Sequence, residues 1–299
     1  MVMPGRTTVV YKRAEGCEIA LDIYRPTANG SVPVVVWIHG GALIMGSRAS
    51  VPDHLFAVCR DYDAALVSID YRLAPQVMLP EIISDLQAAF RWVHTDGPGV
   101  AGLDPTRIVV VGASAGGYLT LMAGFAVEPK PLALVSYYGY GDIDSVWYTE
   151  PSEHYRQVVP VYTRDEALGG LRSGVVASPP NQEQADARRR YYHYLRQNGL
   201  WSVEVAGFDP ARGRSALDPF CPIRNVSASY PPTMLLHGTA DTDVPYTCSV
   251  EMAQELSRHG VRHELVTLDG AEHGLVGVDP ALVAAANAKA HTFIGEHLG

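Results

Sequence analysis

The sequence predicts an α/β fold in which a mostly parallel sheet carries helices on both faces and an inserted cap. Three observations support this prediction. Runs of consecutive apolar residues recur along the chain, which is typical of strands covered on both faces. Segments with helical apolar spacing separate these runs, as in right-handed β–α–β units. The chain has 299 residues, of which 47% are hydrophobic, so it can bury one large core.

The predicted strands follow two patterns. Residues 19–23 alternate apolar and polar side chains, which predicts a half-buried, antiparallel strand near an edge of the sheet. The strands after it are nearly continuous apolar runs, as expected inside a parallel sheet. These runs cover residues 32–38, 64–69, 107–111, 132–138 and 232–236, and a final strand is expected at 264–268.

Helices are expected between these strands. Residues 82–93 place apolar side chains at i, i+3, i+4 and i+7 spacing, which predicts one buried helix face. Further helices are predicted at residues 118–125, 250–259 and 282–293.

One long segment interrupts the alternation of strands and helices. About 90 residues separate the predicted strands at 132–138 and 232–236, against about 30 for a simple β–α–β unit. The predicted organisation is therefore a core from residues 1–143 and 218–299, with a cap or lid at 144–217.

The predicted cap holds one expected helix, at residues 183–197, and many aromatic side chains. These either pack a small satellite core or form a lid over a pocket, and both interpretations stay open. Residues 188–190 are three arginines, expected on a solvated helix face, with attraction of an anionic substrate as the alternative. The aromatic residues are Trp147, Tyr148, Tyr155, Tyr162, Tyr191, Tyr192, Tyr194 and Trp201.

Charge and composition exclude several classes of protein. The formal net charge is -9, which disfavours nucleic acid as a partner. No apolar run reaches the roughly 20 residues that span a bilayer, and no signal peptide is visible in the sequence. Four cysteines without a C-x-x-C pair indicate reduced thiols in a cytoplasmic protein, unless a leader was removed. A small-molecule ester substrate is the expected partner, and the sequence leaves open whether the protein forms a homodimer.

The sequence G-x-S-x-G occurs where a buried strand meets a helix, at residues 112–116. This turn must be tight and strained to raise the hydroxyl of Ser114 above the sheet edge. The glycines on either side leave room for neighbouring backbone. Ser114 is therefore the predicted nucleophile, and it needs a base because a protonated hydroxyl is a weak nucleophile.

A second predicted part of the site follows the end of another buried strand. His39-Gly40-Gly41-Ala42 follows the strand at 32–38, and its backbone N–H groups are expected near Ser114, where they can bind an oxyanion. Ala42 replaces a frequent third glycine but keeps the N–H donor. His39 itself is expected to shape the loop.

An acid and a histidine complete the expected set. Asp241, in the loop after the strand at 232–236, is preferred over Asp243, which is expected to be a solvated loop acid or a helix cap. His273, in a glycine-flanked loop after the last strand, is the candidate base, whereas His237 is expected to shape its loop. No H-E-x-x-H sequence is present, so neither a catalytic metal nor a cofactor is expected.

These motifs together resemble the α/β-hydrolase superfamily, and most closely its hormone-sensitive-lipase-like and feruloyl-esterase-like carboxylesterases. The resemblance rests on HGGA, YRLAP, GASAGG, HGTADTDVP and GAEHG, and covers residues 17–143 and 218–297. YRLAP departs from the commoner form only after Pro75, where Gln76 replaces an acid. Tyr71 and Arg72 of this segment are interpreted as loop supports.

The resemblance implies an enzyme that hydrolyses carboxylic esters. It implies Ser114 as nucleophile, His273 as general base and Asp241 as its orienting acid. It also implies an oxyanion hole from the N–H groups of Gly41, Ala42 and Ala115.

The substrate class is less constrained. A small to medium, or aryl, acyl group is expected, with an amidase, arylformamidase or exopeptidase on the same residues as the alternative. The candidate substrate-binding residues are Tyr118, Tyr138, Trp147 and Tyr148.

Overall fold

The structure, a computed structural model, describes residues 5–207 and 213–299. Residues 208–212 of the predicted cap lie outside the described residues. The strands form one sheet in the order β1-β2-β4-β3-β5-β6-β7-β8. The strands are β1 (Arg6–Ala14), β2 (Cys17–Tyr24), β3 (Val32–Ile38), β4 (Ala65–Ile69), β5 (Leu103–Ala113), β6 (Ala133–Tyr137), β7 (Thr233–Gly238) and β8 (His263–Leu268).

The sheet is mostly parallel, as the sequence predicts. The pairs β1–β2 and β2–β4 are antiparallel, and every other neighbouring pair is parallel. The apolar strands β3 and β4 are buried along their whole length. Continuous burial on both faces explains why their sequences lack alternation.

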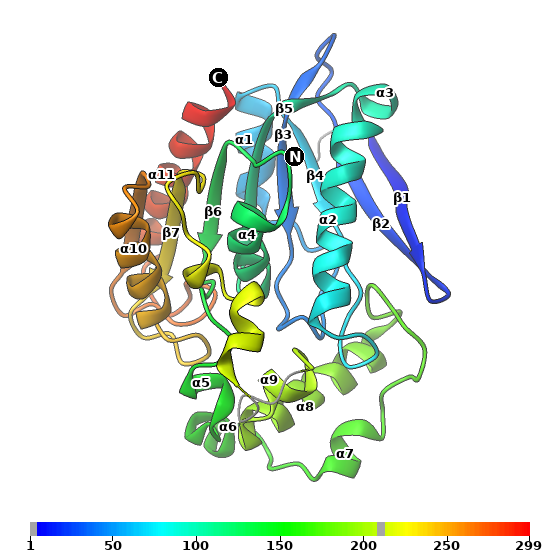
Figure 1. Ribbon diagram of the computed structural model, residues 1–299, viewed down its shortest axis with the longest axis vertical. Coiled ribbons are helices and arrows are strands. Elements are labelled where there is room, and N and C mark those ends of the chain that lie inside the picture. Colours follow the sequence, from blue (N-terminus) through cyan, green and yellow to red (C-terminus); the bar gives the residue numbers. More distant parts are fainter. Residues whose placement is uncertain (1–4, 208–212) are drawn as a thin grey trace.

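Helices cover both faces of this sheet (Figure 1). Apolar residues of α2, α4 and α10 join one core cluster, and those of α1 and α11 join the other. The core helices are α1 (Asp53–Asp61), α2 (Leu79–Thr95), α3 (Gly97–Ala101), α4 (Ala115–Ala126), α10 (Thr247–Arg258) and α11 (Pro280–Leu298).

The segment between β6 and β7 lies beyond the carboxyl ends of the parallel strands (Figure 1). Its buried residues Tyr191, Leu195 and Trp201 belong to the same core cluster as α2 and α4, so the two parts share one hydrophobic core. Its helices are α5 (Val146–Thr149), α6 (Glu153–Val158), α7 (Arg164–Leu168), α8 (Gln182–Asn198) and α9 (Trp201–Glu204), followed by the 3₁₀ turns η2 (Arg214–Phe220) and η3 (Pro222–Arg224).

The first two strands differ from the prediction. The sequence analysis does not predict β1, which lies at one edge of the sheet, because the residues of β1 form no buried apolar run. Strand β2 is buried rather than half-buried: Asp22 is 2% exposed. The Asp22 carboxylate accepts a hydrogen bond from Thr8 at 2.6 Å and pairs with Arg48 at 3.1 Å, which compensates its burial.

Candidate active site

Ser114 lies in a strained turn between β5 and α4. Its φ of 55° and ψ of -121° are sparsely populated for a residue with a side chain, at a cost of about 1–3 kcal/mol. A Cβ on Gly112 would lie 2.2 Å from the carbonyl oxygen of Gly116, and one on Gly116 would lie 2.0 Å from that of Ile38. Both glycines are therefore required, because backbone occupies the space of a side chain.

Ser114, His273 and Asp241 lie in one hydrogen-bonded line. The Ser114 Oγ is 3.1 Å from Nε2 of His273, and Nδ1 of the same ring is 2.8 Å from Oδ2 of Asp241. The three residues follow the carboxyl ends of β5, β7 and β8. This is the edge at which open α/β sheets place their sites, and the structure brings together the residues that the sequence predicts there.

Asp241 is held as a carboxylate. Burial alone would raise its pKa, but hydrogen bonds from His237 and His273, the charge of His273 and the N–H of Val244 hold the pKa of Asp241 well below its usual range. The backbone N–H groups of Asp243 and Val244 donate to Oδ1 at 2.9 and 2.8 Å. An ionised acceptor next to Nδ1 keeps the proton of neutral His273 on that nitrogen, so Nε2 is free to accept the proton of Ser114.

The sequence predicts only a loop-shaping role for His237, but the structure places its ring in contact with Asp241. Its Nε2 is 3.2 Å from Oδ2 of Asp241 and 3.0 Å from the carbonyl oxygen of Val244, so this nitrogen carries the proton and donates. Nδ1 accepts from the hydroxyl of Ser249 at 2.7 Å. The carboxylate of Asp241 therefore accepts from two imidazoles, and only the tertiary structure reveals the second one.

His273 also lies close to a second acid. Burial would lower its pKa, but the hydrogen bond with Asp241 and the negative charges of Asp243 and Asp241 outweigh that effect, so the pKa of His273 is raised above 6.5. Oδ2 of Asp243 is 3.6 Å from Nε2. The expectation that Asp243 is a solvated loop acid or a helix cap is wrong, because its side chain pairs with buried Arg196 of α8 and the N-cap of α10 is Tyr246.

The loop that carries Gly41 and Ala42 packs directly against the nucleophile. A Cβ on Gly40 would lie 2.8 Å from the carbonyl oxygen of Ala113 and 3.2 Å from Cβ of Ser114. Gly41 and Ala42 have φ values of 112° and 55°, a left-handed conformation that turns the loop over the serine. Ala115 is the first residue of α4. An oxyanion hole from these three N–H groups stays a prediction that this proximity supports.

Two buried side chains of the segment after β6 hold this loop. Trp201 donates from Nε1 to the carbonyl oxygen of Ala42 at 3.0 Å. Arg188 donates to the carbonyl oxygens of Ile44 and Ala74, both at 2.8 Å. The expectation of a solvated arginine face at 188–190 is therefore wrong for Arg188, which is 1% exposed.

Replacing Trp201 by phenylalanine is expected to lower kcat about tenfold with little change in KM, because the Ala42 peptide loses its brace beside the nucleophile. Trp37→Phe is the matched control. Trp37 also donates from Nε1 to a backbone carbonyl, that of Ser50 at 2.9 Å, but it lies in the other core cluster. Both variants should lose about 1 kcal/mol of unfolding free energy. Equal kcat values for the two would contradict the role of Trp201.

The predicted substrate-binding residues differ in position. Tyr118 and Tyr148 are 0% and 2% exposed, so the expectation that they contact substrate does not fit their burial. Tyr118 donates to the carbonyl oxygen of Phe220, and Tyr148 stacks on Trp201 with ring centroids 4.0 Å apart. Trp147 packs on Tyr148, whereas the ring of Tyr138 lies 4.8 Å from that of His273. Tyr138 is thus the predicted residue closest to the reacting groups.

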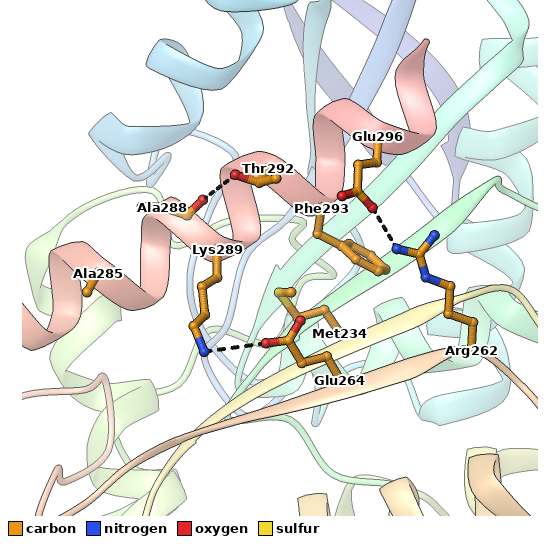
Figure 2. A pocket seen from close by; sticks show the side chains of 9 residues that line it. All are labelled: Met234, Arg262, Glu264, Ala285, Ala288, Lys289, Thr292, Phe293 and Glu296. Carbon is orange, nitrogen blue, oxygen red and sulfur yellow. Dashed lines mark hydrogen bonds and ion pairs between the residues drawn. The ribbon is translucent and has the colours of Figure 1, made fainter.

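A cavity of about 360 Å³ lies beside β7, β8 and α11 (Figure 2). Met234 and Glu264, which line it, are at the amino ends of their strands, opposite the end that carries Asp241. Its charged side chains pair with one another, Lys289 with Glu264 at 3.5 Å and Arg262 with Glu296 at 2.6 Å. None of the residues predicted for catalysis lines this cavity.

Two features are absent from residues 5–207 and 213–299. No helix there combines the length and apolar character needed to cross a membrane. No three metal-ligating side chains gather there into a metal site.

The fold of this chain is similar to that of solved structures of other proteins. A protein of unknown function from Staphylococcus aureus subsp. aureus Mu50 superposes with a TM-score of 0.76 at 20% identity, covering 98% of this chain and 99% of that one. Native esterase 2 of Thermogutta terrifontis superposes with a TM-score of 0.67 at 22% identity, covering 98% and 93% of the two chains.

Sequence relatives include segments of much longer proteins. A non-reducing polyketide synthase of Stereocaulon alpinum is 26% identical over 302 residues, covering 89% of this chain and 12% of that protein. One from Preussia isomera is 27% identical over 303 residues, covering 89% and 13%. The chain thus spans about one eighth of the length of these relatives. The model of the alpha/beta hydrolase fold family matches residues 35–277, and the chain belongs to that family.

Proposed function

We propose that the protein hydrolyses carboxylic esters of small to medium, or aryl, acids through an acyl-enzyme on Ser114. The observation that carries this proposal is the hydrogen-bonded line from Ser114 through His273 to Asp241. In the same proposal, residues 1–143 and 218–299 form the catalytic core and residues 144–217 form a cap over it. No cofactor is needed for this reaction.

The first step forms the acyl-enzyme. The Ser114 Oγ attacks the ester carbonyl while Nε2 of His273 takes the hydroxyl proton, which leaves an imidazolium beside ionised Asp241. The developing oxyanion is stabilised by the N–H groups of Gly41, Ala42 and Ala115, at about 3–4 kcal/mol per donor. His273 then donates its proton to the departing alcohol, and the C–O bond breaks.

The second step regenerates the enzyme. Water takes the place of the alcohol, and His273 removes one of its protons as the oxygen attacks the acyl carbonyl. The tetrahedral intermediate collapses, the bond to Ser114 breaks and His273 returns the proton to Oγ. The carboxylic acid leaves.

The pH dependence follows from the raised pKa of His273. The reaction needs this imidazole neutral, so kcat/KM is expected to fall as the pH falls through its pKa, with the midpoint above pH 6.5. The measurement is kcat/KM for a nitrophenyl ester from pH 4 to 9. A profile that stays flat down to pH 4 would contradict His273 as the base.

A second candidate is hydrolysis of an acyl thioester. The observation that favours it is the match to segments of non-reducing polyketide synthases. A thioester presents the same electrophilic carbonyl to Ser114 and passes through the same oxyanion.

A panel of leaving groups on one acid separates these candidates. Phenyl butyrate, the butyryl thioester of thiophenol and butyranilide share their acyl group, so kcat/KM reports the leaving group alone. The proposal expects the phenyl ester to be cleaved fastest, and Ser114→Ala to lower the cleavage rate of each compound about 10⁶-fold. A clear preference for the thioester would favour the second candidate, and a preference for the anilide would identify an amidase.

A further inference from the structure

Asp243 places a carboxylate beside the catalytic imidazole, on the side away from Asp241. Its Oδ2 is 3.6 Å from Nε2 of His273, the nitrogen that also faces Ser114. Asp241 already accepts from Nδ1 on the other side of the ring. The ring of His273 therefore lies between two carboxylates, and only one of them belongs to the hydrogen-bonded line of the proposed mechanism.

The position of Asp243 is fixed by residues of α8 and by its own loop. Its Oδ1 accepts hydrogen bonds from the Tyr192 hydroxyl and from a guanidinium nitrogen of Arg196, the latter at 2.5 Å. The same nitrogen of Arg196 donates to the carbonyl oxygen of Asp243 at 2.9 Å. The backbone N–H of Asp243 donates to Asp241. These contacts hold Oδ1 away from the ring and leave Oδ2 toward His273.

Arg196 compensates the burial of this acid. It is 3% exposed and lies over four aromatic rings, with its guanidinium carbon 5.0–5.8 Å from their centroids. The rings are those of Trp147, Tyr148, Tyr155 and Tyr192. Among these side chains, the one positive charge of Arg196 compares with the two negative charges of Asp241 and Asp243, so their sum is negative while His273 is neutral.

The distance to Nε2 relates this charge to the leaving group. A departing oxygen receives its proton from Nε2 at a hydrogen-bond distance of about 3 Å. Since Oδ2 of Asp243 is 3.6 Å from Nε2, the departing oxygen lies at most about 6.6 Å from Oδ2, the sum of the two distances. A substituent two or three bonds beyond the oxygen can therefore contact this carboxylate, whose side chain is 17% exposed.

We propose that Asp243 makes the site selective for esters whose leaving alcohol carries a cationic amine. This inference rests on the proposed function and names its substrate class on the leaving-group side. A protonated amine near the departing oxygen forms a charge-assisted hydrogen bond with Oδ2. An anionic substituent at the same place meets repulsion from Asp243 and, beyond the ring, Asp241.

Three butyrate esters of matched shape test this selectivity. They carry 2-(dimethylamino)ethyl, 3-methylbutyl and 2-carboxyethyl alcohols, which are cationic, neutral and anionic at pH 7.5. The wild-type protein is expected to show a kcat/KM about tenfold higher for the cationic than for the neutral ester, and lowest for the anionic one. In Asp243→Asn the three values should converge to within about twofold, because the amide keeps the shape but loses the charge.

A control and a second readout separate this role from others. Asp186→Asn removes an acid of the same charge from an exposed position on α8 and should leave the tenfold ratio intact. If Asp243 acts only on the pKa of His273, Asp243→Asn moves the pH profile of all three esters equally and leaves their ratio unchanged. That result would overturn the proposal.

The wild-type protein provides a test that needs no variant. Its preference for the cationic ester should shrink as ionic strength rises from about 0.02 to 0.5 M, because salt screens a partly exposed pair. Equal kcat/KM values for the three esters at low salt would overturn the inference alone. Failure to cleave even the neutral ester would overturn the proposed function, and this inference with it.

Discussion

Ser114→Ala is expected to lower kcat about 10⁶-fold while the protein stays folded. The variant keeps the turn between β5 and α4 but loses the Ser114 Oγ, which lies 3.1 Å from Nε2 of His273. In the described part of the chain, this is the only hydroxyl hydrogen-bonded to that nitrogen. Binding of substrate should persist, because the loop of Gly41 and Ala42 is untouched. The measurement is kcat for phenyl butyrate, together with the melting temperature.

A buried serine elsewhere provides the control for this variant. Ser68 donates to the carbonyl oxygen of Arg48 at 2.7 Å and is fully buried in β4. Ser68→Ala should lose about 1 kcal/mol of unfolding free energy and keep its kcat. Activity of Ser114→Ala within a hundredfold of the wild type would mean that another residue forms the acyl-enzyme.

Asp241→Asn should lower kcat about 10³- to 10⁴-fold, the second largest effect expected. The carboxylate accepts from both His273 and His237, whereas an amide has one acceptor oxygen and presents N–H donors. An N–H facing Nδ1 of His273 forces the proton onto Nε2, so the ring can no longer accept the proton of Ser114. KM should change little, since Asp241 is buried behind the imidazole.

The control for this variant is an acid in a neighbouring loop. Asp269 accepts from the hydroxyl of Thr239 at 2.9 Å in the loop that leads to His273. Asp269→Asn should keep kcat within about twofold. A loss of activity in Asp241→Asn no larger than that in Asp269→Asn would remove Asp241 from the mechanism.

The central strands could be predicted because burial on both faces leaves a mark in consecutive residues. Val34, Val35 and Val36 are all buried, and no periodicity is needed to recognise such a strand. The edge strand β1 leaves no such mark, because each of its residues is exposed or only partly buried. Helix α1 is short, with only Leu55, Val58 and Cys59 buried, so its pattern is weak.

The site was predictable where backbone geometry restricts the residue type. The turn at Ser114 tolerates only glycine at positions 112 and 116, so the sequence itself records the geometry. Asp241 and His273 follow strand ends, which parallel topology brings to one edge.

The supporting residues were not predictable, because their partners are distant in sequence. Arg196 meets Asp243 across 47 positions, Arg188 meets Ile44 across 144 and Trp201 meets Ala42 across 159. The sequence around an arginine or tryptophan in a helix does not reveal which distant backbone or side chain it contacts. The only available hint for Asp243 is its spacing, two residues after Asp241 in one tight loop.

Covalent labelling with a fluorophosphonate tests the central claim most directly, because it reports which hydroxyl the imidazole activates. Intact-mass analysis followed by peptide mapping locates the adduct. The expected result is one adduct per chain, on Ser114, with labelling absent in Ser114→Ala and strongly slowed in His273→Ala. Full labelling of Ser114→Ala, or an adduct mapped to any other residue of the wild-type protein, would contradict the account.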